Sequence, residues 1–268
     1  MDTNAYRQFE QFSNLDLTVI EKTDEYICYK HNQDKLFLFD SSSELIQTYN
    51  HLDFVRSLTK RIGLLLPAIW DSGQRDDLYF LLASSIERPD NESVEDCDLK
   101  TLAVDLADFL KQLKSHASQI ELSGNFENID FSGNIESLRK TIAAQPCGND
   151  QKVYTDMINQ GLESSDETHP TLLYGNIGCA NLVLSNGRLI GIDQVATPYF
   201  GDEAFGYAIG YHCLDKDSRA VFFQELGCDQ GTKKRARNWA LFQALGASSS
   251  DDPAALKTLY HIFEEYYS

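Results

Sequence analysis

The chain has 268 residues, of which 42% are hydrophobic and 11% aromatic, values typical of a folded globular protein rather than a disordered one. Forty-one acidic against 23 basic residues give a formal net charge of −18. This charge argues against binding to nucleic acid or to an anionic membrane surface, since both require a positive footprint. It favours a cationic small molecule or a basic protein as a partner, or it serves solubility alone.

The cysteines, histidines and apolar runs exclude further classes. Six scattered cysteines form no CxxC pair and no signal peptide is recognised, so we expect reduced thiols and a cytoplasmic protein. No apolar run approaches the roughly 20 residues of a membrane-spanning helix, so we expect no membrane role. No two histidines are four residues apart, which leaves zinc without a predicted site.

Residues 1–87 predict a small β-rich lobe. Short apolar runs rich in aromatic and β-branched residues indicate strands, and apolar residues at helical spacing indicate one helix. The strands are predicted at residues 17–20, 26–30, 36–39 and 78–84, and the helix at residues 44–58.

Residues 99–268 predict a larger, mainly helical lobe, joined to the first by the acidic, proline-containing segment 88–98. The first helix carries a stripe of leucines from Leu102 to Leu113 that we expect to be buried. The overall prediction is an α+β chain of two lobes. Further helices are predicted at residues 135–144, 153–162, 205–213, 218–226, 233–245 and 253–267, and a surface loop at residues 124–134.

A predicted β-hairpin brings two polar side chains together. Asn186-Gly187 is a pair that type I′ turns favour, and it lies between two apolar runs. Counting from this turn puts Asn181 opposite Ile192, one residue before Asp193. Facing residues lie roughly 5 Å apart, so we expect Asn181 and Asp193 to converge if both leave the pleat there.

An amide oxygen and a carboxylate form a pair of hard ligands that Mg²⁺ accepts, while it takes the rest of its shell from water and phosphates. We therefore predict a metal site at Asn181 and Asp193. The alternative is structural, because asparagine and aspartate are also common at the polar end of a hairpin, where they cap turns.

The same stretch resembles a family of small-molecule kinases, the aminoglycoside phosphotransferases, choline kinases and fructosamine kinases. The resemblance is specific over about forty residues, and residues 196–208 look most like the fructosamine kinase branch. It implies a bilobal protein kinase-like fold with ATP and Mg²⁺ as candidate cofactors. The matching positions are Tyr174-Gly175-Asn176, Asn181, Ile192-Asp193 and Gly201-Asp202, in the family's order and spacing.

The resemblance also implies roles for individual residues. Asn181 and Asp193 take the positions that hold Mg²⁺ on the nucleotide phosphates, and Tyr174 takes the position of a family histidine. Asn176 takes the position of the aspartate that deprotonates the substrate hydroxyl. A carboxamide cannot accept that proton at neutral pH.

The nucleotide-binding elements of the family are altered as well. No glycine precedes Gly63, so the chain lacks the bare backbone turn that covers the phosphates. The position of the phosphate lysine falls on Phe39, with Lys30 and Lys35 as candidate substitutes from neighbouring positions. Glu44 is the candidate for the nucleotide-binding glutamate that pairs with this lysine, or simply an acid favoured at a helix N-terminus.

Three hypotheses follow. Loss of the base costs about 10² to 10⁴ in rate, and loss of the lysine and the turn removes positioning too. The leading hypothesis is therefore a pseudokinase that binds a nucleotide or a partner, with phosphotransfer lost or very weak. The alternative is an active kinase of a small amine or sugar, with Asp202 or Glu203 as the proton acceptor, although Asp202 is also a typical helix N-cap. The third is a scaffold that binds no nucleotide.

Overall fold

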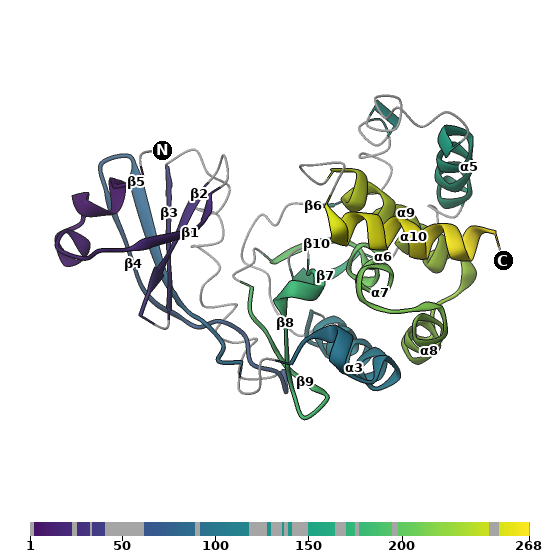
Figure 1. The fold of residues 1–268 in the computed structure, drawn as a ribbon. Helices are drawn as coiled ribbons and strands as arrows, with labels where there is room; N and C mark the ends of the chain where they lie inside the picture. Colours follow the sequence, from purple (N-terminus) through teal and green to yellow (C-terminus); the bar gives the residue numbers. More distant parts are fainter. Residues whose placement is uncertain are drawn as a thin grey trace.

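The structure is a computed structural model. It has a β-sheet region at the N-terminal end and a helical region at the C-terminal end, which form two lobes (Figure 1). The predicted α+β, bilobal fold class is confirmed. The structure describes residues 3–22, 26–32, 34–40, 62–88, 92–117, 128–129, 136, 139–140, 150–163, 170–174, 177–194, 198–246 and 252–267.

The N-terminal lobe contains a five-stranded sheet of order β1-β2-β3-β5-β4, in which all neighbouring strands are antiparallel. The four predicted strands correspond to β1, β2, β3 and β5. Strand β4 escaped prediction because it is an edge strand of mostly polar residues, which carry no apolar alternation. The strands are β1 (Thr18–Lys22), β2 (Tyr26–His31), β3 (Asp34–Asp40), β4 (Ile69–Arg75) and β5 (Leu78–Ser84).

Aromatic residues pack on both faces of this sheet. On one face, the 3-10 helices Ala5–Gln8 and Glu10–Phe12 and the residue between them, Phe9, pack against the sheet. The centroids of the Phe9 and Phe80 rings are 4.9 Å apart. On the other, Phe39 is 1% exposed and stacks on Tyr79. Phe39 is therefore a core residue. The predicted helix over residues 44–58, with Glu44, lies outside the described residues.

The connection between the lobes contains a 3-10 turn, Val94–Asp96, in which Ser93 and Asp96 form a capping box. The Glu92 carboxylate accepts a hydrogen bond from the Gly187 amide at 2.9 Å. This bond attaches the connection to the tip of the hairpin in the C-terminal lobe.

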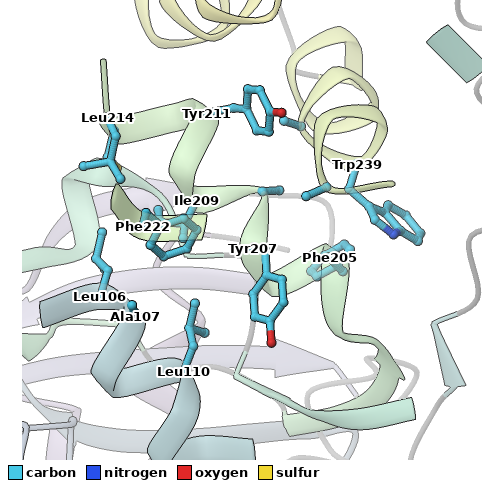
Figure 2. Packing of buried hydrophobic residues seen from close by; sticks show 14 of the residues in the cluster. Leu106, Ala107, Leu110, Phe205, Tyr207, Ile209, Tyr211, Leu214, Phe222 and Trp239 are labelled. Carbon is cyan, nitrogen blue, oxygen red and sulfur yellow. The ribbon is translucent and has the colours of Figure 1, made fainter. Parts of the chain in front are cut away.

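The C-terminal lobe packs its helices around a core of aromatic and aliphatic side chains (Figure 2). The predicted helix 205–213 is interrupted at Ala208, because glycines at positions 206 and 210 lower helix propensity there. The other helices contain their predicted ranges to within one residue. Of the predicted helix 135–144, the structure describes only residues 136, 139 and 140, and all three are helical. The helices are α3 (Leu99–Ala117), α5 (Asp150–Leu162), α6 (Glu203–Tyr207), α7 (Ile209–Cys213), α8 (Lys216–Leu226), α9 (Gln230–Gly246) and α10 (Pro253–Tyr266).

A small sheet of order β6-β10-β7 completes this lobe, with β7 (Pro170–Tyr174) and β10 (Pro198–Asp202) antiparallel. Strand β6 (Asn128–Ile129) pairs in parallel with β10, so the predicted loop over residues 124–134 is wrong at these two positions. Two residues are too few to produce a periodic signal. Within the described parts of the chain, no helix has the length and apolarity to cross a bilayer.

Candidate functional site

The hairpin forms as predicted at its tip. It consists of β8 (Leu182–Ser185) and β9 (Arg188–Ile192), with Ser185 paired to Arg188. Asn186 and Gly187 both have positive φ, 50° and 70°, as a type I′ turn requires.

A β-bulge changes the register further along. Ile190 is an extra residue in β9, so Ile192 pairs with Leu182 and not with Asn181. The predicted Asn181–Ile192 pair is wrong. The shift by one residue places Asp193 next to Asn181, and the Asp193 amide donates to the Asn181 carbonyl at 2.7 Å. The bulge therefore brings Asn181 and Asp193 together. The sequence-based prediction relied instead on the pleat ending at these two residues.

The bulge lies where the N-terminal lobe contacts β9. Leu65 donates its amide to the Ile190 carbonyl and accepts from the Ile192 amide, both at 2.9 Å. A Cβ atom at Gly191 would lie 2.8 Å from the Leu65 carbonyl oxygen. Glycine at position 191 therefore permits the backbones of the two lobes to approach one another.

An ion pair joins the lobes at the end of the hairpin. The Lys35 Nζ atom, at the start of β3, lies 2.9 Å from Asp193 Oδ2, and the Ile86 amide donates to Asp193 Oδ1 at 3.3 Å. Lys30, the cross-strand neighbour of Lys35, is exposed. The lysine that faces Asp193 is thus Lys35. The position predicted for it, Phe39, is wrong because that ring is in the core.

A cavity of about 270 Å³ surrounds this ion pair between the lobes. Among the residues that the structure describes, its charged groups are Lys35, Asp193 and Glu21, and the last of these comes from β1. Burial raises the pKa of the Cys28 thiol to about 12, although the nearby charge of Lys35 opposes this increase. Cys28 therefore lines the cavity as an uncharged thiol. The lining residues are Ile20, Glu21, Tyr26, Cys28, Lys35, Phe37, Asn181, Asp193 and Gln194.

Asn181 is held in a tight turn, the 3-10 helix Cys179–Asn181. Its side-chain Oδ1 accepts from the Gly178 amide at 2.8 Å, and its amide donates to the Gly178 carbonyl at 3.0 Å. Asn181 and Asp193 both line the cavity, and an amide oxygen together with a carboxylate is a donor set that fits Mg²⁺. Among the residues that the structure describes, no group of three or more His, Cys, Asp or Glu side chains forms a metal cluster. Asn176 lies outside the described residues.

Several solved structures that resemble this chain in fold are phosphotransferases. The GDP complex of aminoglycoside 2'-phosphotransferase-IIIa superposes with a TM-score of 0.71 at 14% identity, over 99% of this chain and 97% of that one. ADP-bound aminoglycoside phosphotransferase APH(2'')-Ib gives 0.61 at 16% identity, over 99% and 97%. The apoenzyme of macrolide 2'-phosphotransferase MphH from Brachybacterium faecium gives 0.56 at 12% identity, over 89% of each chain.

The chain has the aminoglycoside phosphotransferase fold. No protein-family model and no curated protein matches it. At 12% to 16% identity, the likeness establishes the fold alone.

Within this phosphotransferase fold, Tyr174 supports the segment that follows Asp193. Its hydroxyl donates to the Gln194 carbonyl at 3.0 Å. Burial, with a contribution from the Asp193 charge, raises the pKa of Tyr174 well above its ordinary range. Tyr174 is thus a neutral hydrogen-bond donor that fixes the backbone next to Asp193.

The two acids proposed as substitute bases are occupied elsewhere in the C-terminal lobe. Asp202 caps α6 by accepting from the Ala204 amide and forms a buried ion pair with Arg235, with Nε 3.0 Å from Oδ2. Glu203 forms an ion pair with Lys114 and accepts from the Tyr207 hydroxyl at 3.1 Å. The N-cap interpretation of Asp202 is confirmed. Neither acid lines the cavity that contains Asp193.

A second cavity, of about 290 Å³, is also lined by Asn181 and lies within the C-terminal lobe. Among its lining residues, His212 bonds through Nε2 to Gln243 Oε1 at 2.6 Å and through Nδ1 to Thr258 Oγ1 at 3.0 Å. Desolvation lowers the pKa of His212, so the neutral imidazole is favoured. The lining residues are Ile177, Gly178, Cys179, Ala180, Asn181, His212, Gln243, Ala244, Asp252, Ala254, Ala255 and Thr258.

Cys179 and Cys213 form a disulfide, although they are 34 residues apart. The prediction of reduced thiols is therefore wrong for this pair, because its two cysteines meet only through tertiary packing. Cys28, Cys97 and Cys228 are free thiols, and Cys147 lies outside the described residues.

Proposed function

We propose that the chain is a pseudokinase of the aminoglycoside phosphotransferase-like type, which binds ATP with Mg²⁺ between its lobes and has lost most or all phosphotransfer. The observation that carries this proposal is the meeting of Lys35 and Asp193 at 2.9 Å in a cavity that Asn181 also lines. Solved structures of the same fold contain GDP or ADP, which supports a purine nucleotide as the ligand.

The three side chains divide the work of nucleotide binding. Lys35 supplies the ammonium group for the phosphates, and Asn181 and Asp193 supply the oxygen ligands for Mg²⁺. Mg²⁺, when bound, neutralises phosphate charge. Without a ligand, the charges of Lys35 and Asp193 compensate one another in their ion pair. When MgATP binds, Lys35 pairs with phosphate and Asp193 with Mg²⁺, so neither charge is left unpaired.

Two features account for weak or absent catalysis. Asn176 stands where the resemblance places the general base, and its carboxamide takes up no proton at neutral pH. Glu21, on strand β1, adds a further carboxylate to the lining of the cavity, and a carboxylate repels phosphate.

The second candidate function is an active kinase of a small amine or sugar. The observation in its favour is the second cavity, which shares Asn181 with the first and therefore lies beside the candidate phosphate site. The acid Asp252 and the overall net charge of −18 suit a cationic acceptor.

The domain limits stay as proposed: an N-terminal lobe at residues 1–87, a connection at 88–98 and a C-terminal lobe at 99–268. We also retain a cytoplasmic location as a proposal, which fractionation of cells that produce the protein would test.

Thermal unfolding with and without MgATP tests the proposed function. A ligand at 100 times its Kd adds about 2.7 kcal/mol of stability to the wild type. Lys35→Ala and Asp193→Ala should lose most of this gain, because each removes a charged contact worth about 1.5–3 kcal/mol. Lys30→Ala is the matched control, since it removes the exposed cross-strand neighbour of Lys35 and should keep the gain. If the wild type gains nothing from MgATP or MgGTP, the scaffold hypothesis replaces the proposal.

A further inference from the structure

We propose that Cys179 and Cys213 are a reversible thiol–disulfide site, which tethers the loop carrying Asn181 to helix α7. The tether is inferred from the structure alone. Only its consequence for nucleotide affinity rests on the proposed function.

The two cysteines lie on different elements of the C-terminal lobe. Their Cα atoms are 5.5 Å apart, within the usual range for a disulfide. Cys213 is 1% exposed at the end of α7, which is anchored in the helical core through Ile209 and Tyr211. Cys179 begins the 3-10 turn on the loop between β7 and β8. The bond therefore fixes a loop to a rigid helix.

The tethered loop carries the candidate metal ligand. Asn181 lies two residues after Cys179 in the same turn, and its side chain and amide both bond to Gly178. With the disulfide closed, Cys179 cannot leave α7, so Asn181 can move away only if the turn unwinds and its bonds to Gly178 break. With the disulfide open, non-covalent contacts alone hold the turn in place, among them the hydrogen bond from the Asp193 amide to the Asn181 carbonyl.

The cavity beside Asn181 gives small thiols access to the bond. Cys179 is partly exposed and lines this cavity, whereas Cys213 is buried and does not. The thiolate of a small monothiol such as glutathione attacks Cys179 Sγ, the protein S–S bond breaks, and Cys213 leaves as a thiolate that takes up a proton. A second glutathione thiolate attacks the glutathione sulfur of the mixed disulfide and releases Cys179. Two protein thiols and one molecule of oxidised glutathione result, so the electrons balance, and the reverse sequence closes the bond.

The other described cysteines are poorly suited to this exchange. Burial raises the pKa of the Cys28 and Cys228 thiols to about 12, and burial also raises the pKa of Cys97. A thiol with a raised pKa forms little of the nucleophilic thiolate. Among the cysteines that the structure describes, exchange should therefore concentrate at Cys179 and Cys213.

Differential alkylation with peptide mass mapping measures the redox state directly. The full-length protein is equilibrated in glutathione buffers that range from wholly reduced to wholly oxidised. We expect the Cys179–Cys213 cross-link to pass from open to closed within this range. A bond that stays closed in reduced glutathione alone would make it a static cross-link, and two thiols that stay alkylatable in oxidised glutathione would mean that no pair forms. Either result overturns the proposal.

Hydrogen exchange of residues 177–182 measures the tether. We expect exchange roughly five-fold or more slower in the oxidised wild type than in the reduced one, since the closed bond suppresses local opening. Cys179→Ser should exchange at the reduced rate under both conditions, and Cys97→Ser, which removes a free thiol elsewhere, should behave as the wild type. Equal exchange in the two redox states of the wild type would overturn the tether.

MgATP affinity measured in both states separates this inference from the proposed function. Tighter binding in the oxidised state, by roughly three-fold or more, is expected from a pre-organised loop. If neither state binds MgATP, the proposed function fails, while the mass mapping and hydrogen exchange still decide the tether.

Discussion

Lys35 Nζ lies 2.9 Å from Asp193 Oδ2, although the two residues are 158 positions apart and belong to different lobes. The side chains are 23% and 11% exposed, so the pair is screened only in part by water. The strand β3 supplies the cation and the bulged hairpin supplies the anion. The pair thus depends on the sheet, the hairpin and the contact of Leu65 with β9 at the same time.

Restoring the acid at position 176 should increase phosphotransfer. Asn176→Asp replaces a group that takes up no proton with one that does, and a general base contributes about 10² to 10⁴ in rate. We expect Asn176→Asp to turn over ATP faster than the wild type in an assay with a panel of small amines and sugars, and Asn176→Asp combined with Asp193→Ala to lose that gain. The active-kinase hypothesis would be favoured by two results together: wild-type turnover far above that of Asp193→Ala, and no further gain in Asn176→Asp.

Asp202 should contribute to stability and not to proton transfer. Its side chain and that of Arg235 are 1% and 0% exposed, so Asp202→Asn removes a negative charge that pairs with a buried guanidinium. The expected loss of unfolding free energy in urea is about 3–5 kcal/mol. Asp108→Asn, which removes an exposed acid near Lys111, should cost far less. A stable Asp202→Asn protein that has lost only catalytic activity would contradict the structural role.

Stability should fall as the solution becomes acidic, through His212 and His261. Desolvation lowers the pKa of both side chains from the unfolded value of 6.5, so the unfolded chain binds more protons than the folded one once the pH falls below about 6.5. Their contribution is complete above that pH and is lost as the pH falls through their folded values, by at most about 1.4 kcal/mol per pH unit for each. Urea unfolding at several pH values should show a weaker dependence in His212→Gln. If the pH dependence of stability is the same in His212→Gln as in the wild type, His212 does not cause it.

The hairpin shows what local sequence signals determine. Asn186-Gly187 specified the turn, and the order of Asn181 and Asp193 around it was enough to predict that they meet. The bulge at Ile190 was not predictable, because it forms against Leu65, which is distant in the sequence. Local pattern thus gave the element and its polar end, and a long-range contact gave the register.

The remaining site features depend on tertiary structure. Lys30 and Lys35 are equivalent as strand lysines, and only the placement of the lobes decides that Lys35 faces Asp193. The Cys179–Cys213 pair has no sequence signature either, since its members are 34 residues apart, on a loop and a helix that meet only through tertiary packing. Composition and periodicity carry no information on such contacts.

The most direct measurement of the central claim is a calorimetric titration of the wild type with ATP, with and without Mg²⁺, beside Lys35→Ala and Lys30→Ala. We predict saturable binding that requires Mg²⁺, is weakened at least tenfold (about 1.4 kcal/mol) in Lys35→Ala and is unchanged in Lys30→Ala. Absence of binding, or binding that ignores both Mg²⁺ and Lys35, would contradict a nucleotide site built on Lys35, Asn181 and Asp193.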